Sequence, residues 1–217
     1  MCDRSGECIR RNAEFHGKNR LTLSRTFGPG PRALVIGCNP SDADALRDDP
    51  TSIWWNRWFE ADGFGGYDAV NLYPICTSSP ADCRRIVAAT DHGARDVRDD
   101  IHFVNLAHIV AKAKAASKVF VCWGAIAWDI DWVEHVVEAI QSGEAPCSEL
   151  WCWGTTQSGA PKHPMARGKH RILADQPAIL WRAASCSVVI RSTVQSRYDV
   201  NERECRPQAI SLPNSDL

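Results

Sequence analysis

The segment VIGCNPSDAD, residues 35–44, joins a short apolar run to polar groups that suit a hydrolytic reaction. The apolar run ends at Gly37, and Asn39 follows, whose side-chain carbonyl can orient a water molecule without acting as a strong base. Asp42 and Asp44 come next, and a positioned carboxylate can accept a proton from such a water. We call residues 37–44 the elbow, and two interpretations stay open for it: an ordinary turn, or the floor of an active site.

A second group of candidate residues lies in the loop PKHPMARGKHR, residues 161–171. His163 precedes a proline, which favours an extended backbone and a fixed direction for the ring. An imidazole can stabilise negative charge that develops on a leaving group. The loop contains no acid, so its cations suit phosphate groups, with a solvated surface loop as the alternative. These cations are Lys162, Arg167, Lys169 and Arg171.

Two further residue types suit a planar ligand. Asn71 offers both a donor and an acceptor, which reading the edge of a nucleobase requires. The aromatic segment 53–59 contains Trp54, which could stack on such a ring or instead pack in the core. Together these groups suit hydrolysis of a glycosidic bond to a nucleobase, in which the base leaves as a stabilised anion and water adds to the sugar.

The elements around these residues alternate between strand and helix. Short apolar runs predict four strands, with one additional edge strand; helical periodicity predicts three helices, and Ser79 followed by Pro80 predicts the start of another. The pattern indicates a three-layer α/β/α fold with a central, mostly parallel sheet of about four strands. The expected strands lie at residues 33–37, 67–74, 118–124 and 149–154, the edge strand at 21–25, and the helices at 51–62, 94–116 and 125–143.

Ligands of parallel sheets bind beyond the carboxyl ends of the strands. The elbow and the loop with His163 each follow an expected strand, and Asn71 lies in the last residues of another, so we expect them to form one site at one edge of the sheet. The other substrate-binding candidates at this edge are Gly37, Cys38, Pro40, Ser41 and Trp123.

The chain of 217 residues has the length of one domain with extensions. We expect a flexible polar N-terminus at residues 1–20 and a single domain at 21–183. A C-terminal extension at 184–217 is expected to be partly disordered, with a possible strand at 187–191.

The formal net charge is −1, so any site for a polyanion must be a local patch. No apolar run approaches the roughly 20 residues that a membrane span needs, and the N-terminus lacks the apolar segment of a signal peptide. We therefore expect a cytoplasmic protein that binds DNA or a nucleotide and no membrane; the sequence leaves the oligomeric state open and favours a monomer.

The ten cysteines are scattered without a C-x-x-C pair, so free thiols without a metal or cofactor are expected. An iron–sulfur or zinc site formed by cysteines that converge in space is the alternative. A run of acids offers oxygen ligands for a metal-dependent nucleotide phosphoesterase, unless these acids only cap a helix or face solvent. The acids are Asp42, Asp44, Asp48 and Asp49.

The order of the motifs resembles the uracil-DNA glycosylase superfamily. The matching segments are GCNP (37–40), VNL (70–72), VCWGAIA (121–127) and KHPMAR (162–167). The resemblance implies a glycosylase-like fold in which Asn39 holds the catalytic water, Asn71 reads the base and His163 stabilises the base anion. It also implies that residues 165–167 lie on a loop that inserts into DNA. Asn39 in place of a carboxylate resembles the mismatch-specific branch.

The chain more closely resembles an uncharacterised bacterial and phage domain family. The resemblance covers about residues 21–170 and rests on LSR (23–25), NPSDAD (39–44), DDPT (48–51), VNL (70–72), WG (123–124) and GAPKHP (159–164).

The expected function is hydrolysis of the N-glycosidic bond of a nucleobase, uracil or a modified or mismatched base, as in DNA repair. The acidic run is unlike a surface that faces DNA, so a free nucleotide is an alternative substrate. A non-catalytic module that binds nucleic acid or a nucleotide is the alternative function, because the same cleft can bind without cutting. A zinc deaminase is a weaker alternative, since the chain lacks H-x-E and P-C-x-x-C.

Overall fold

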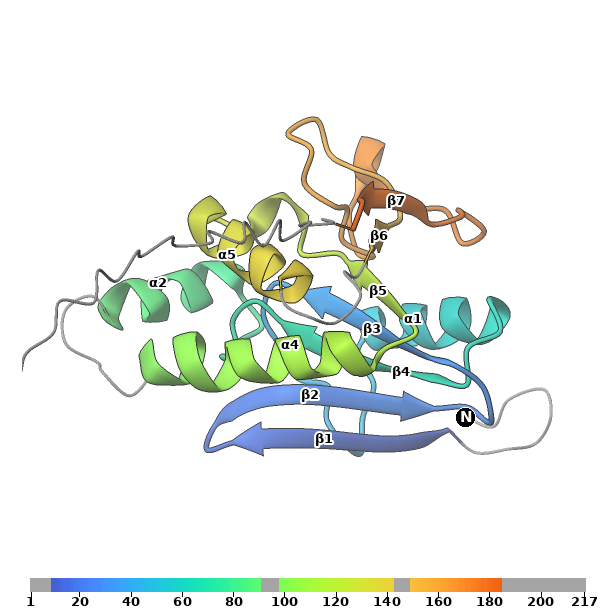
Figure 1. Cartoon of the computed structure of the whole chain (residues 1–217), viewed down its shortest axis with the longest axis horizontal. Helices are drawn as coiled ribbons and strands as arrows, with labels where there is room; N and C mark the ends of the chain where they lie inside the picture. The colour runs from blue at the N-terminus through green and yellow to red at the C-terminus, as the bar shows by residue number, and fades with distance from the viewer. Residues whose placement is uncertain (1–8, 91–97, 143–148, 185–217) are drawn as a thin grey trace, which may run out of the picture. The chain divides into compact units, whose positions relative to one another are not determined.

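The computed structural model describes residues 9–90, 98–142 and 149–184. Within them one sheet has seven strands in the order β1-β2-β4-β3-β5-β6-β7 (Figure 1). The strands are β1 (Arg10–His16), β2 (Asn19–Thr26), β3 (Arg32–Gly37), β4 (Gly66–Asn71), β5 (Lys118–Val121), β6 (Leu150–Cys152) and β7 (Ile179–Arg182). The α-helices are α1 (Pro50–Ala61), α2 (Pro80–Thr90), α4 (Leu106–Ala115) and α5 (Ile130–Gln141), and a π-helical turn at Asp100–Asn105 precedes α4.

The sheet is mixed. The pairings among β4, β3, β5 and β6 are parallel, whereas β1 with β2, β2 with β4, and β6 with β7 are antiparallel. The predicted α/β class is confirmed, and the prediction of a mostly parallel sheet of about four strands is wrong. β1 and β7 were not expected, and β2 lies between two strands instead of at the edge.

The N-terminal boundary needs a correction, because residues 10–20 were expected to be flexible. They form β1 and the start of β2, which pair from Arg10 opposite Thr26 to His16 opposite Asn19. β1 is an edge strand whose side chains are mostly exposed, so its sequence RRNAEFH is as polar as that of a flexible segment. The expected extension at 184–217, with its possible strand at 187–191, lies outside the described residues beyond Ala184.

Helices cover both faces of the sheet, because alternate residues of each central strand point to opposite sides. On β3, Leu34 and Ile36 face a core that includes Ile109 of α4 and residues of α2 and α5. Val35 faces the other core with Phe59 of α1. All five side chains are fully buried. None of the helices in the described ranges is long and apolar enough to cross a membrane.

The helix expected at 125–143 begins later, at Ile130. The side chain of Asp129 accepts a hydrogen bond from the backbone of Trp132 and so caps the helix. The preceding residues, Gly124–Ile126, form a 3₁₀ turn in which Gly124 has a φ of +72°. This turn follows β5 and brings the chain next to the loop that carries His163.

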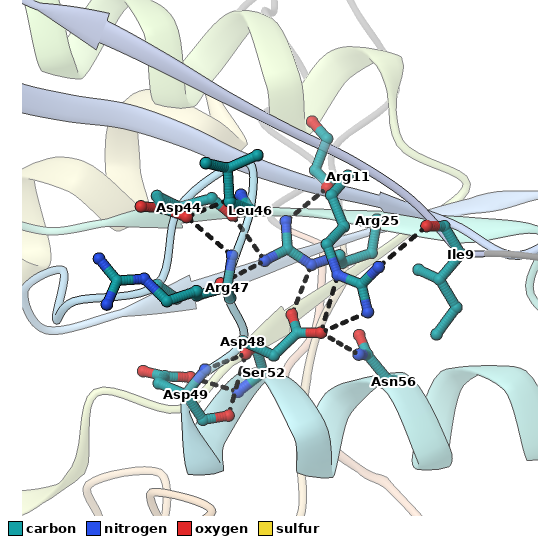
Figure 2. A network of polar contacts seen from close by, with 12 residues as sticks. Ile9, Arg11, Arg25, Asp44, Leu46, Arg47, Asp48, Asp49, Ser52 and Asn56 are labelled. Atoms are coloured by element: carbon teal, nitrogen blue, oxygen red, sulfur yellow. Dashed lines mark hydrogen bonds and ion pairs between the residues drawn. The ribbon is translucent and has the colours of Figure 1, made fainter. Parts of the chain in front are cut away.

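The loop between β3 and α1 is fixed to the sheet by a buried ion pair, which Figure 2 shows. The fully buried Arg25 of β2 donates from Nε to Asp48 Oδ1 at 2.7 Å. Its Nη2 donates to the backbone carbonyls of Asp44 and Arg47, at 2.9 and 3.2 Å. Arg11 of β1 donates to the second oxygen of Asp48 at 3.0 Å. One guanidinium therefore holds the end of the loop at three points.

The carboxylate of this ion pair is kept ionised. Burial raises the pKa of Asp48, but the hydrogen bonds and charges of Arg25 and Arg11 outweigh it and leave the pKa below its ordinary value. Asn56 of α1 adds a longer contact to the same carboxylate, at 3.4 Å. Strands β1 and β2 and helix α1 thus meet at one side chain.

We expect Asp48→Ala to lower the free energy of unfolding by about 3 kcal/mol, because it leaves the buried Arg25 without a counter-ion. Urea denaturation followed by circular dichroism measures this change. Arg85→Ala is the matched control, since it removes an ion pair with Asp82 whose side chains are exposed. A loss of stability in Asp48→Ala no larger than in the control would contradict the structural role given to the ion pair.

Candidate active site

A cavity of about 320 Å³ lies at the carboxyl ends of β3 and β4. Gly37, Cys38 and Asn39 line it from the end of β3, and Asn71 lines it from the end of β4. His163 closes it from the late loop. This volume lies at the small end of the range for ligand pockets and accommodates a nucleobase.

The predicted site residues divide into two groups. Seven of them line the cavity: Gly37, Cys38, Asn39, Ser41, Asp42, Asn71 and His163. Eight do not: Pro40, Asp44, Trp54, Trp123, Lys162, Arg167, Lys169 and Arg171. The first group comes from the ends of β3 and β4, the loop after β3 and, for His163, the late loop, and most of the second comes from the basic loop and the aromatic segments.

Asn39 is oriented by the loop that precedes α2. Its amide nitrogen donates to the backbone carbonyl of Thr77 at 2.9 Å, to the Thr77 hydroxyl at 3.2 Å and to the carbonyl of Pro40 at 3.1 Å. The amide nitrogen of Asn39 is therefore fully engaged by Thr77 and Pro40. The carbonyl Oδ1 makes no hydrogen bond to a described residue, which leaves an acceptor for a water molecule or ligand.

Asn71 presents an unengaged amide to the cavity. The side chain is only 5% exposed, and it makes no hydrogen bond to another described residue. Its backbone carbonyl is held by the side chain of Asn105 at 3.0 Å. A Cβ on Gly37 would lie 2.8 Å from Asn71 Oδ1, so the glycine makes room for the amide. Both a donor and an acceptor are thus available to a ligand.

The tautomer of His163 is set by its own loop. Its Nδ1 accepts a hydrogen bond from the backbone N–H of Met165 at 3.1 Å. Burial lowers the pKa of His163 from its ordinary value of 6.5, although the charge of Asp49 acts in the opposite direction. The ring is therefore neutral at pH 7, with its proton on Nε2. A neutral donor of this kind can stabilise an anion without transferring its proton.

The acidic run does not act as one group. Asp42 is exposed and lines the cavity. Asp49 also lines the cavity, and it caps α1 by accepting a hydrogen bond from the backbone N–H of Ser52 at 2.7 Å. The same carboxylate accepts a hydrogen bond from the hydroxyl of Ser41. Asp44 accepts from the backbone N–H groups that follow it, at 2.7 and 2.8 Å, and closes a turn outside the cavity. These hydrogen bonds lower the pKa of Asp44.

Two expectations about these acids change accordingly. Asp44, a predicted catalytic base, is a turn residue, and Asp48 is the partner of Arg25. In the ranges that the structure describes, no group of three or more His, Cys, Asp or Glu side chains could hold a metal ion. The predicted capping role of the acids applies to Asp49.

Trp54 does not line the cavity, whereas the next residue, Trp55, does. Neighbouring side chains of a helix point in directions about 100° apart, so only one of the two can face the cavity. Trp54 stacks on Trp58 at 6.4 Å between ring centroids and meets the edge of Trp153 at 5.0 Å. Trp123 is 2% exposed and packs against Trp181. The core interpretation of the tryptophan cluster is therefore the one that the structure favours for Trp54.

The basic loop does not contribute its cations to the cavity. Arg167, Lys169 and Arg171 are exposed. The side chain of Lys162 lies against Gly154 instead: a Cβ added to Gly154 would lie 3.6 Å from the Nζ of Lys162. The loop instead supplies His163 and the exposed side chain of Met165 to the cavity rim.

Cys38 lines the cavity as a thiol. Burial raises its pKa to about 12, so the sulfur is protonated at neutral pH and is a poor nucleophile. The cysteines of the described ranges, Cys38, Cys76, Cys83, Cys122 and Cys152, are free.

Several cavity residues were missed by the sequence analysis, above all Arg20 and Trp55. Arg20 stands in a polar segment with no motif around it, so no local signal distinguishes it. Trp55 could have been chosen over Trp54 only by knowing which side of α1 faces the sheet. Asp49 had a signal, because Asp followed by Pro marks a helix start.

A family model described as "Protein of unknown function (DUF1643)" matches residues 20–165. Arg20 and Met165, the first and last matched residues, both line the cavity. No curated protein and no solved structure matches the chain. The match confirms the predicted uncharacterised domain family, and nothing in these comparisons supports the resemblance to uracil-DNA glycosylases.

We expect nitrogen NMR of the His163 ring to show the proton on Nε2 at pH 7 and a titration midpoint below 6.5. Because the folded pKa lies below the unfolded one, the unfolded chain binds more protons, and stability contributed by this group is lost as the pH falls below 6.5. His163→Gln assigns the resonance. A proton on Nδ1 at pH 7 would show that Met165 does not set the tautomer, and a midpoint above 6.5 would contradict the lowering of the pKa by burial.

We expect Gly37→Ala to displace the amide of Asn71 while leaving the fold intact, since the new Cβ would meet only the end of that side chain. Proton–nitrogen correlation spectra should show a shifted Asn71 side-chain amide, and Asn71→Ala identifies the signal. Thermal unfolding should change by only a few degrees, as expected for a cost on the order of 1 kcal/mol. An unmoved amide signal would contradict the close approach of Gly37 and Asn71.

Proposed function

We propose that this chain, which belongs to the DUF1643 family of proteins of unknown function, hydrolyses the N-glycosidic bond between a nucleobase and its sugar. One observation supports the proposal above all others. Asn39, Asn71 and His163 come from three distant segments, share one cavity, and each keeps unengaged the polar atom that the reaction needs.

In the proposed binding step, the base enters the cavity and pairs with the amide of Asn71 through its donor and acceptor edge. The Nε2–H group of His163 donates to an oxygen of the base. This hydrogen bond strengthens as the base gains negative charge, so it stabilises the transition state more than the bound substrate.

In the proposed chemical step, the bond between the sugar C1′ and the base nitrogen breaks, and its electron pair stays on the base. The oxygen of a water molecule, oriented by Asn39 Oδ1, bonds to C1′. Asp42 accepts the proton that this water loses and returns it to solvent. The base anion takes a proton from solvent, so the products are the free base and a sugar with a hydroxyl at C1′.

The substrate is either a base within DNA or a base within a free nucleotide. A uracil or a modified or mismatched base fits the proposal, because these bases carry an oxygen at the ring edge that His163 can contact. The exposed cations of the loop, among them Arg167, Lys169 and Arg171, suit contacts with a phosphate backbone outside the cavity. The binding module without catalysis shares the first step and lacks the second.

The test is release of free base from uracil, hypoxanthine, xanthine, 5-hydroxymethyluracil and G·T or G·U mismatches, each offered in oligonucleotides and the first three also as nucleotides. We expect His163→Ala to lower the rate by a factor of about 10² to 10³, the usual effect of removing a group that stabilises an anion. His170→Ala, the same substitution in the same loop outside the cavity, should keep the wild-type rate. Chromatography of the released base measures all three proteins.

EDTA distinguishes the alternatives. Release of base should persist in EDTA, whereas a metal-dependent phosphoesterase would release phosphate and stop in its presence. If the protein binds a ligand that contains a base but forms no product from any substrate, the result would support a non-catalytic binding module and contradict the proposed enzyme. Equal rates in His163→Ala and His170→Ala would remove the proposed role of His163.

A further inference from the structure

Arg20 is a buried cation in the cavity wall that the proposed reaction does not use. The residue is 4% exposed, at the start of β2. Its Nη1 donates to the backbone carbonyls of Ser41, at 3.5 Å, and Ala43. Its Nε is buried without a hydrogen-bond partner, and Nη2 makes no hydrogen bond to a described residue. The guanidinium thus has donors without an acceptor among the described residues, and Arg20 lines the cavity.

Arg25, on the same strand, shows what a satisfied buried arginine looks like in this protein. It pairs with Asp48 at 2.7 Å, and all its nitrogens have acceptors. Arg20 has no carboxylate of a described residue within ion-pair distance, and the charge of Asp49 acts on it only from further away. A buried charge without a counter-ion is costly, and an anionic ligand that supplied the missing charge would offset this cost.

Hydroxyl groups and helix ends near Arg20 suit an anion, and the carboxylates of Asp42 and Asp49 line the same cavity. The hydroxyl-bearing residues Ser41, Thr77 and Ser78 line the cavity. α1 and α2 both begin at its wall, with Pro50 and Pro80 in contact with it. The N-terminus of a helix carries partial positive charge, which favours phosphate; that of α1 is already capped by Asp49, and that of α2 is the nearer candidate.

Sheet order places this cation one strand from Asn71 and at the far end of the cavity from His163. β2, with Arg20, is followed in the sheet by β4, with Asn71, then β3, with Gly37, then β5, whose continuation Gly124 contacts His163. From β2 to β5 the sheet spans three strand spacings, about 14 Å at the backbone. A phosphorylated nucleoside has its base and its phosphate at opposite ends, as this arrangement requires.

We propose that Arg20 binds the phosphate of a nucleotide whose base lies between Asn71 and His163. The part concerning the phosphate rests on Arg20 and its surroundings, and only the position of the base rests on the proposed function. The phosphate belongs to a free nucleoside 5′-monophosphate or, with the same chemistry, to the nucleotide of a DNA strand.

The experiment measures binding and needs no turnover. Inorganic phosphate is titrated into the full chain at constant ionic strength and followed by phosphorus NMR and calorimetry. We expect Arg20→Gln to weaken phosphate binding about tenfold or more, the effect of losing hydrogen bonds to a charged group. Arg57→Gln, which removes the same charge from an exposed position on α1, should bind phosphate as the wild type does.

A second variant guards against misfolding of Arg20→Gln. Ser78→Glu adds a negative charge at an exposed position of the cavity rim, leaves Arg20 in place, and should also weaken phosphate binding about tenfold. Circular dichroism checks the fold of each variant. If Arg20→Gln does not fold, the result for Ser78→Glu decides.

Binding of three further ligands is compared to decide whether the phosphate belongs to a free nucleotide or to a strand. They are deoxyuridine, deoxyuridine 5′-monophosphate and a short single-stranded oligonucleotide with one uracil. We expect the wild type to prefer the monophosphate over the nucleoside about tenfold, and Arg20→Gln to lose this preference. An Arg20-dependent preference seen only with the oligonucleotide assigns the phosphate to a strand.

The outcomes separate this inference from the proposed function. Phosphate binding that depends on Arg20, without release of base, supports the inference and removes the glycosidase. Release of base from unphosphorylated deoxyuridine, with no phosphate binding, overturns the inference and leaves the glycosidase. Equal phosphate affinity in the wild type, Arg20→Gln and Ser78→Glu overturns the inference outright.

Discussion

The ion pair between Arg25 and Asp48 is the constraint on which the candidate site depends. The loop from β3 to α1 carries Asn39 and Asp42, yet it has no regular secondary structure to hold its backbone. Arg25 supplies that support by binding two of its carbonyls together with the carboxylate of Asp48 (Figure 2). Because Asp48 also binds Arg11, the edge strand β1 contributes to a site that it does not touch.

The same logic recurs around the cavity, where structural hydrogen bonds select the atom that each functional side chain has left to offer. Thr77 and Pro40 occupy the amide nitrogen of Asn39 and leave its carbonyl. Met165 occupies one ring nitrogen of His163 and leaves the other as a donor. Such preorganisation matters for catalysis because groups that are already oriented need not reorganise during the reaction.

Two arginines on β2 show how context assigns different roles to one residue type. Arg25 is buried with all its donors satisfied, whereas Arg20 is buried with donors to spare. Only the first arrangement stabilises the protein on its own, since an uncompensated buried charge lowers stability. The difference lies in the acceptors that distant segments bring to each guanidinium, and it separates a structural residue from a candidate ligand-binding one.

The sequence by itself determined the α/β class, the central strands and the placement of Asn39 and Asn71 at strand ends, because apolar runs and turn residues are local signals. It did not determine β1 as a strand, because a polar edge strand takes its order from pairing with β2 and not from burial of its own side chains. Only the tertiary structure decided that Asp44 closes a turn, that Trp55 and not Trp54 faces the cavity, and that Arg20 belongs to the site. Each of these depends on which distant groups lie opposite a side chain, and hydrogen bonds and ion pairs between segments far apart in the chain leave no periodic pattern in the sequence.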